Sequence, residues 1–174
     1  CIMKVFPNIT IYTPSDDISA AKIAKKIIDK NHFNYLRLDR DALPSIYKTR
    51  SFNFDQGYNF IIKNNNKVCI VTSGYLTHKA IKISESLKGK IDIIDLFRIK
   101  PFPKKILNIL KKYKIVITLE EQLAAGGFGA TIQEEASNNN IKINIKKFCL
   151  DDKFFFENGG RDYLHNKYGL SSDK

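Results

Sequence analysis

Arginine is scarce in this chain of 174 residues. Lysine and arginine together number 29, and only five of them are arginine. Two of the five, Arg37 and Arg40, lie three positions apart in Tyr35-Leu-Arg-Leu-Asp-Arg40. A guanidinium group holds a phosphate or carboxylate at two points, which an ammonium group cannot do. The pair therefore predicts an anion site, and the alternative is that both arginines pair with the neighbouring Asp39 and Asp41.

Cysteine is also sparse. Cys1, Cys69 and Cys149 are odd in number, lie far apart and include no CxxC pair. This spacing argues against a disulfide framework and a zinc site, and it favours a reducing compartment, the cytoplasm or an organelle if the source is eukaryotic. Cys69 and Cys149 lie in apolar runs, which predicts buried, unreactive thiols. The three histidines form neither a catalytic motif nor a metal-ligand spacing.

Membrane and nucleic-acid signals are missing from the sequence as given. No apolar stretch reaches membrane-spanning length, and no charged-then-apolar leader precedes the first predicted strand. The net charge of +11 is spread along the chain, without a helix-turn-helix, zinc-finger or RNP-type motif. We therefore expect neither a membrane nor a nucleic-acid partner, whereas the positive field would attract anionic metabolites.

The hydrophobic pattern predicts a strand at residues 9–13, a helix at 18–28 and a second strand at 33–38. Either Ser15 or Asp16 is placed to cap the helix. A strand–helix–strand unit of this length makes its two strands parallel. Arg40 then lies at or just past the carboxyl end of the second strand, where open α/β sheets bind ligands. Alternation along the strand would point Arg37 to the other face.

The rest of the chain predicts a second α/β unit. Residues 41–57 carry little periodic pattern and form a predicted linker. Two apolar runs on either side of Asn64-Asn65-Asn66 predict a hairpin, and hence one antiparallel strand. Predicted helices lie at 75–88, 103–112, 127–137 and 161–168, and predicted strands at 91–96, 115–119 and 141–148. The alternation predicts a mostly parallel sheet with helices on both faces.

Three motifs follow predicted strands. Gly126-Gly-Phe-Gly129 opens a helix without dinucleotide or P-loop spacing, which favours close helix packing over phosphate binding. Glu120 and Glu121 point to opposite faces of their strand, so they do not form an acid–base pair. We expect one of them to bond backbone donors in the glycine loop. Thr72-Ser-Gly74 either holds an anion or caps the following helix.

Read in order, the landmarks of this chain resemble the carboxyl-terminal part of the transketolase family of thiamine diphosphate enzymes. They are Ile2-Met-Lys-Val-Phe-Pro-Asn8, Tyr12-Thr-Pro-Ser-Asp16, Tyr35-Leu-Arg-Leu-Asp-Arg40, Val71-Thr-Ser-Gly74, Ile94-Asp-Leu96 with Lys100-Pro101, Glu120-Glu121 with Gly126-Gly-Phe-Gly129, and Lys167-Tyr-Gly-Leu170. No single segment is specific, but their order and spacing extend over essentially the whole chain.

The resemblance implies two domains. Residues 1–45 correspond to the tail of the family's pyrimidine-binding domain, 46–57 to a linker and 58–174 to the complete C-terminal domain, a three-layer α/β/α sandwich with one antiparallel strand. In that family an arginine matching Arg40 contacts the substrate phosphate, and Arg37 matches a commonly basic position. The resemblance therefore ranks Arg40 first and Arg37 second as phosphate-binding residues.

The resemblance also implies missing parts. The family's Gly-Asp-Gly…Asn segment, which holds Mg²⁺ and the diphosphate, and its glutamate for the aminopyrimidine ring both lie outside this sequence. We therefore expect no catalytic, cofactor-binding or metal-binding residue in this chain, and no activity without an N-terminal section or subunit. A homodimer or an α2β2 assembly is implied. Cys1 is not an initiator methionine, which indicates a piece of a longer polypeptide.

The implied activity is a transferase that moves two-carbon ketol units between sugar phosphates of pentose phosphate metabolism. Three alternatives stay open: deoxyxylulose-phosphate synthase, the β subunit of a 2-oxoacid dehydrogenase, and a non-catalytic module for oligomerisation or regulation. The segment containing Arg37 and Arg40 favours a phosphosugar enzyme over the dehydrogenase, because a substrate without phosphate needs no such anchor.

Overall fold

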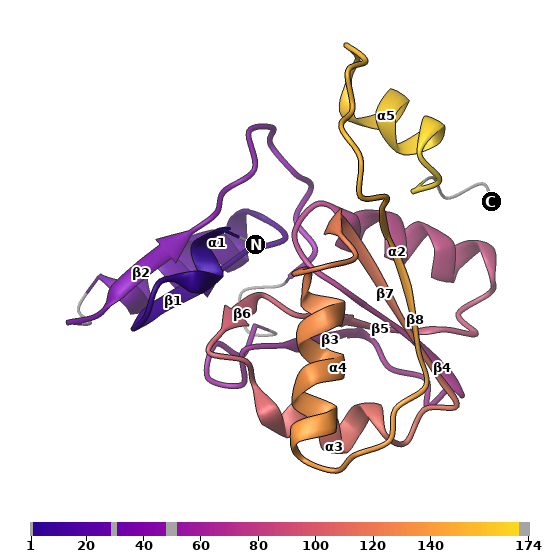
Figure 1. Ribbon diagram of the computed structural model, residues 1–174, viewed down its shortest axis with the longest axis horizontal. Helices are drawn as coiled ribbons and strands as arrows, with labels where there is room; N and C mark the ends of the chain where they lie inside the picture. Colours follow the sequence, from indigo (N-terminus) through magenta and orange to yellow (C-terminus); the bar gives the residue numbers. More distant parts are fainter. Residues whose placement is uncertain (1, 29–30, 48–51, 171–174) are drawn as a thin grey trace.

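Two sheets flanked by helices account for the strands in the described residues, which are 2–28, 31–47 and 52–170 (Figure 1). This computed structural model contains a three-stranded sheet at the N-terminal side and a five-stranded sheet built from the later part of the chain. The mixed α/β class predicted from the sequence is confirmed.

The smaller sheet begins with the predicted strand–helix–strand unit. β1 (Ile9–Tyr12) and β2 (Phe33–Leu36) are parallel, and α1 (Asp17–Ile27) connects them. Of the two candidate caps, Asp16 begins the helix. Its carboxylate accepts a hydrogen bond from the Ser19 amide at 2.7 Å, and the Ser19 hydroxyl accepts one from the Asp16 amide at 3.1 Å. This reciprocal pair satisfies donors that the first turn leaves free.

A third strand of this sheet comes from the later part of the chain. β6 (Arg98–Lys100) is antiparallel to β1, and the Thr13 amide bonds the Phe97 carbonyl at 2.7 Å, which gives the order β2-β1-β6. The sequence analysis predicted no strand here, since three residues before Pro101 are too few to show alternation. The two predicted units therefore share a sheet.

The larger sheet has the order β3-β5-β4-β7-β8. Its strands are β3 (Asn59–Ile62), β4 (Val68–Thr72), β5 (Asp92–Asp95), β7 (Ile115–Leu123) and β8 (Ile145–Leu150). All are parallel to their neighbours except β3, which is antiparallel to β5. The predicted antiparallel strand is confirmed, but the predicted hairpin is wrong because β5 lies between β3 and β4.

A buried carboxylate explains the path of that connection. Asp92, at the start of β5, accepts hydrogen bonds from the Asn64 amide at 2.9 Å and from the Asn66 side chain at 2.8 Å. The asparagine-rich turn is therefore held across the end of β5 rather than closing a tight hairpin.

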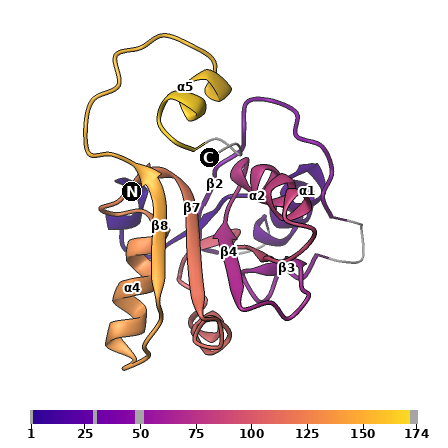
Figure 2. The same ribbon diagram turned by 90° about the vertical axis from the view of Figure 1, so that its right-hand side faces the viewer.

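Helices cover both faces of the larger sheet. α2 (Leu76–Ser86) packs on one face, while the 3₁₀ turn η2 (Lys104–Ile106), α3 (Leu107–Leu110) and α4 (Phe128–Asn138) pack on the other. In Figure 2 the neighbouring strands β8, β7 and β4 lie side by side. The predicted three-layer sandwich is confirmed.

Successive side chains of β4 point to opposite faces of the sheet and pack in both helix–sheet interfaces. Cys69 and Val71 belong to the core under α3 and α4, whereas Ile70 belongs to the core under α2. Cys69 is fully buried, and burial raises the pKa of its thiol, as expected for an unreactive cysteine. Cys149 on β8 is only partly buried.

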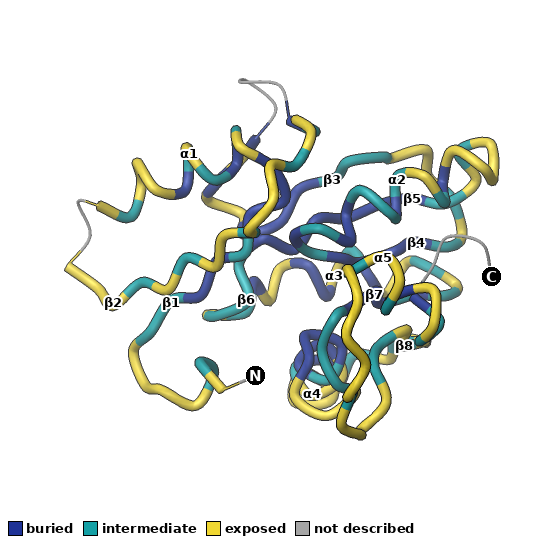
Figure 3. The backbone as a smooth tube through the Cα atoms, turned by 90° about the horizontal axis from the view of Figure 1, so that it is seen from above, coloured by how far each residue is buried: buried dark blue, intermediate teal, exposed yellow. Residues whose placement is uncertain are grey.

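An aromatic cluster joins the two sheets. Tyr12, Tyr47, Phe52, Phe54 and Phe97 are all buried and pack together. The rings of Phe52 and Phe97 are 4.6 Å apart between centroids. Figure 3 shows buried backbone continuing from the smaller sheet into the larger one. Three of these residues lie in or beside the predicted linker, of which positions 48–51 fall outside the described residues; the domain boundary itself stays a prediction.

A buried carboxyl group occupies the same junction. Asp95 is completely buried and accepts hydrogen bonds from the Ser15 hydroxyl at 2.9 Å and from the Tyr47 hydroxyl. Burial raises the pKa of Asp95 to about 7, against the effect of these donors. The junction therefore contains a titratable group as well as apolar contacts.

The last helix lies beyond the strand ends. α5 (Arg161–Lys167) follows an irregular segment after β8 and lies near α2 (Figure 1). The Tyr75 hydroxyl donates to Asp162 at 2.8 Å, which attaches the helix to the start of α2. No helix in the described ranges is long and apolar enough to cross a membrane.

Candidate functional site

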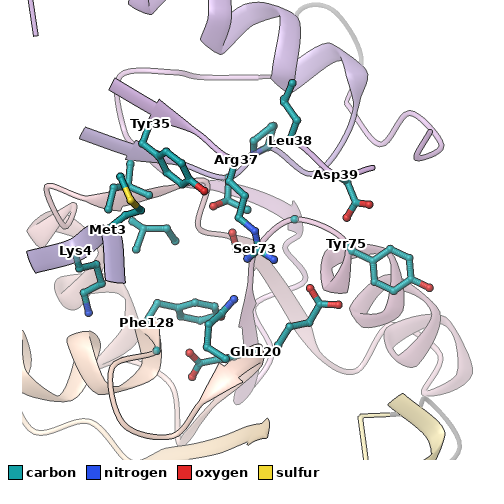
Figure 4. Close-up of a pocket in the computed structure, with 18 of the residues that line it drawn as sticks. Met3, Lys4, Tyr35, Arg37, Leu38, Asp39, Ser73, Tyr75, Glu120 and Phe128 are labelled. Atoms are coloured by element: carbon teal, nitrogen blue, oxygen red, sulfur yellow. The ribbon is translucent and has the colours of Figure 1, made fainter. Parts of the chain in front are cut away.

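A cavity of about 550 Å³ opens where strands of both sheets end (Figure 4). Residues 13–14 follow β1, residues 37–40 follow β2 and residues 73–75 follow β4, and all of them contribute to its wall. Residues 120–122 of β7 and residues 126–127 before α4 complete the opposite side. Ligands of open α/β sheets bind at such carboxyl ends, so this cavity is the candidate site.

Both candidate arginines line this cavity. β2 ends at Leu36, and the Arg37 amide still bonds the Tyr12 carbonyl at 2.9 Å before the chain leaves the sheet. Strand alternation therefore does not extend from Arg37 to Arg40, and the prediction that they face opposite ways is wrong. In Figure 4 the Arg37 side chain points into the cavity, toward Ser73. The ranking of the two in binding stays a prediction.

Neither arginine has an ion-pair partner in the part of the chain that the structure describes. Asp39, between them in sequence, is bonded to Arg161 instead: Nη1 lies 2.8 Å from Oδ2 and 3.0 Å from Oδ1. Asp41 forms no ion pair with them within the described ranges. Pairing with the neighbouring aspartates is therefore not what holds these arginines, and two guanidinium groups remain available to a ligand.

Arg161 also bonds the end of β7. Its Nε lies 3.0 Å from Oε1 of Glu121, and its guanidinium lies 4.3 Å from the centre of the Tyr75 ring. Burial by itself raises the pKa of Glu121, but the hydrogen bond from His165 and the charge of Arg161 outweigh it, and the net pKa is lowered. Sequence reasoning missed Arg161, although its rarity among the basic residues was a usable signal.

His165 also contacts the Glu121 carboxylate. Its Nε2 lies 3.0 Å from Oε1 of Glu121, and its Nδ1 lies 2.8 Å from the ammonium of Lys79. An imidazole that donates through Nε2 and accepts through Nδ1 satisfies both neighbours. The side chain is buried, and both of its ring nitrogens have partners.

Glu120 points away from Glu121 and caps α4. Its Oε1 accepts hydrogen bonds from the Gly129 amide at 3.1 Å and the Thr118 hydroxyl at 2.9 Å. Burial raises the pKa of Glu120 against these donors. A methyl group on Gly129 would lie 2.6 Å from the Thr118 oxygen. The glycine loop therefore lets the helix approach a buried glutamate, which confirms the predicted structural role.

Ser73 presents a hydroxyl without a partner among the described residues. α2 begins after Tyr75 without any side-chain cap, so the capping explanation of Thr72-Ser-Gly74 is wrong. The Ser73 Oγ atom is buried, unbonded there, and part of the cavity wall. A hydroxyl in the same cavity wall as two guanidinium groups adds a donor suited to an anion.

Lys4 adds a cation that sequence reasoning did not single out. It lies in the 3₁₀ turn η1 (Ile2–Val5), and its Nζ donates to the Gly126 carbonyl at 3.3 Å and to the Thr131 hydroxyl. The Lys100 ammonium holds that turn by donating to the Lys4 carbonyl at 2.8 Å. Burial lowers the pKa of Lys4. One lysine among so many carries no local signal.

The cavity does not match the cofactor that the family resemblance implies. Among the residues that the structure describes, no group of three or more His, Cys, Asp or Glu side chains could hold a metal ion. The chain also has no Gly-Asp-Gly…Asn segment for a magnesium diphosphate. The arginines and Ser73 suit an anion, so we assign no thiamine diphosphate or Mg²⁺ contact to this chain.

Comparison with known sequences gives consistent matches. The family model of the transketolase C-terminal domain matches residues 57–174. The chain is 32% identical over 165 residues to 1-deoxy-D-xylulose-5-phosphate synthase of Francisella tularensis subsp. mediasiatica, which covers 93% of this chain and 26% of that protein. A protein of the same name from Caldanaerobacter subterraneus is 27% identical over 174 residues, covering 98% and 28%. The chain thus spans about a quarter of these curated relatives.

Solved structures share the fold. A split-gene transketolase, described as an inactive β4 tetramer, matches with a TM-score of 0.86 and 26% identity over 98% of this chain and 56% of that one. Transketolase of Pichia stipitis in complex with sedoheptulose 7-phosphate matches with a TM-score of 0.72 over 99% of this chain and 25% of that one. At 17% identity, this second match shows the fold alone.

Proposed function

This chain belongs to the transketolase family through its C-terminal domain, and from this premise we propose that it forms the phosphate-binding wall of a thiamine diphosphate enzyme that acts on phosphorylated sugars. The observation that carries the proposal is the placement of Arg37 and Arg40 in one cavity, with no ion-pair partner among the described residues.

The proposed role of the arginines is to bind and orient the substrate. A guanidinium group forms two parallel hydrogen bonds to a phosphate dianion, and the Ser73 hydroxyl adds a third donor. The phosphate itself does not react, so its binding energy holds the distant reacting carbons in position. Arg40 is proposed as the main contact and Arg37 as the second.

The donor substrate divides two candidate activities. We favour 1-deoxy-D-xylulose-5-phosphate synthesis, because curated relatives of that name align over almost the whole chain. Transfer of a two-carbon ketol unit is the second candidate, since a split-gene transketolase matches with a TM-score of 0.86. Both use a sugar phosphate, so both are consistent with the arginine site. We disfavour a 2-oxoacid dehydrogenase subunit and a purely non-catalytic module, because neither has a substrate phosphate for the two arginines to bind.

The rest of the enzyme is proposed to come from another section or subunit. Thiamine diphosphate, when bound there with Mg²⁺, supplies the carbanion chemistry. This chain would contribute substrate binding in a homodimer or an α2β2 assembly, in the cytoplasm or an organelle.

Replacement of Arg40 tests the phosphate contact. In the enzyme assembled from this chain and its completing section, Arg40→Ala should lower kcat/KM for a phosphorylated substrate by about 10- to 100-fold, because a hydrogen bond to a charged group contributes about 1.5–3 kcal/mol. Lys146→Ala, which removes an exposed cation on β8, should leave kcat/KM within about twofold. An Arg40→Ala enzyme with unchanged kcat/KM would refute the role.

Product analysis tests the reaction. The assembled enzyme is given an aldose phosphate with either pyruvate or a ketose phosphate as donor. Formation of 1-deoxy-D-xylulose 5-phosphate from pyruvate supports the favoured activity, and turnover of the ketose phosphate alone supports ketol transfer. Turnover of neither donor contradicts both candidates.

A further inference from the structure

We propose that Arg161 is a positioning residue that keeps Arg37 and Arg40 free for a phosphate dianion, because it occupies the two carboxylates beside them. This inference rests on the proposed phosphate site. It assigns a role to α5, which the sequence did not connect with the arginine pair.

The contacts are close and partly shielded from water. Arg161 Nη1 lies 2.8 and 3.0 Å from the two oxygens of Asp39, and Nε lies 3.0 Å from Glu121 Oε1. The side chains are 30%, 14% and 19% exposed, respectively. Charged hydrogen bonds of this kind are stronger than exposed ion pairs, which water screens. One guanidinium group therefore holds both acids.

The guanidinium group of Arg161 is itself held in place. It stacks over Tyr75 at 4.3 Å, and the Tyr75 hydroxyl donates to Asp162, the next residue of α5. Lys79 lies 3.2 Å from the same aspartate. Arg161 and Tyr75 both line the cavity, but these contacts tie Arg161 to the start of α2 and involve no ligand. Arg161 can therefore hold the acids whether or not a ligand is present.

Removing Arg161 would leave Asp39 and Glu121 free to pair with the two remaining arginines of the site. Asp39 lies between Arg37 and Arg40 in sequence, and the charge of Arg37 already contributes to lowering the pKa of Glu121. With Arg161 present, three guanidinium groups and two carboxylates give the site a net charge of +1. Without Arg161, two guanidinium groups and two carboxylates give a net charge of zero. The freed carboxylates would then compete with a phosphate for the two remaining arginines.

Phosphate binding to this chain tests the idea. Xylulose 5-phosphate and inorganic phosphate are titrated into the wild type, Arg161→Ala, Asp39→Asn and the Asp39→Asn/Arg161→Ala double variant, with calorimetry as the readout. We expect Arg161→Ala to weaken binding of both ligands at least tenfold. The double variant should recover affinity to within about threefold of the wild type, because the competing aspartate is neutral.

Controls separate this role from support of the fold. Lys167→Ala removes another ion pair of α5, to Glu157, and should leave affinity unchanged. Arg161→Lys keeps the charge but not the fork, so it should fall between the wild type and Arg161→Ala. Thermal unfolding of every variant shows whether α5 remains folded, and a loss of affinity that merely follows a loss of stability overturns the proposal.

The outcomes separate a failure of the proposed Arg161 role from a failure of the proposed phosphate site. Unchanged affinity in Arg161→Ala overturns the inference, and so does a double variant that binds as weakly as Arg161→Ala. An effect on only one of the two ligands also overturns it, because the common group is the phosphate. Arg40→Ala that binds as well as the wild type, or a wild type that binds neither ligand, overturns the phosphate site itself.

Discussion

Removing the ring of Phe97 should uncouple the two sheets. Phe97 is completely buried, and its ring centre lies 4.6 Å from that of Phe52 and 6.4 Å from that of Phe54. Truncating a buried phenylalanine to alanine costs about 3–5 kcal/mol, which includes the lost aromatic contacts. For a chain of this size, about 4 kcal/mol corresponds to a melting temperature lower by about 8–16 °C.

Urea and thermal unfolding followed by circular dichroism measure this loss. Phe154→Ala is the matched control, because Phe154 is 86% exposed and its truncation should change the free energy of unfolding by less than about 0.5 kcal/mol. Phe97→Leu refills part of the cavity and should fall between the two. A Phe97→Ala protein as stable as the Phe154→Ala protein would show that the aromatic cluster does not join the sheets.

Two further predictions concern buried groups. Burial raises the pKa of Asp95 in the folded state from 3.8 to about 7, so between these pH values the folded protein holds a proton that the unfolded chain has lost. The free energy of unfolding should therefore fall by up to about 4 kcal/mol as pH rises from about 4 to 7. Urea titrations should show that Asp95→Asn flattens this slope, and an unchanged slope contradicts the assignment. Gly129→Ala should lower the free energy of unfolding by about 1–3 kcal/mol, because its methyl group would meet Thr118. Gly160 has open space around it, so Gly160→Ala should lower the same free energy by less than about 0.5 kcal/mol. Equal losses in the two variants would contradict the packing argument.

Local patterns predicted the elements but not all of their partners. Apart from η1 and β6, the strands and helices lie within a few residues of their predicted positions, because apolar periodicity is a property of each segment alone. Strand pairing is a property of the whole chain. The asparagine turn resembles a hairpin in sequence, yet Asp92 holds it across another strand, and β6 joins a sheet that began about ninety residues earlier.

The site shows the same limit. Arg37 and Arg40 are visible in sequence because they are close together and chemically unusual, and both do line the cavity. Arg161 bonds Asp39 and Lys4 bonds Gly126, in each case across 122 positions of the chain. Lys4 is one of many lysines and carries no local signal, whereas the rarity of arginine marks Arg161 without indicating its partners. Only the fold brings the two side chains to the same strand ends.

The pairing of β6 with β1 limits how this chain can be dissected. A recombinant piece that begins at residue 57 would retain β6 but lose its strand partner, and Phe97 would lose the aromatic rings that cover it from the N-terminal side. Its exposed edge and ring would favour aggregation during expression. Truncation experiments on the C-terminal domain should therefore keep residues 9–57 attached, since β1 and the aromatic rings of this segment cover β6 and Phe97.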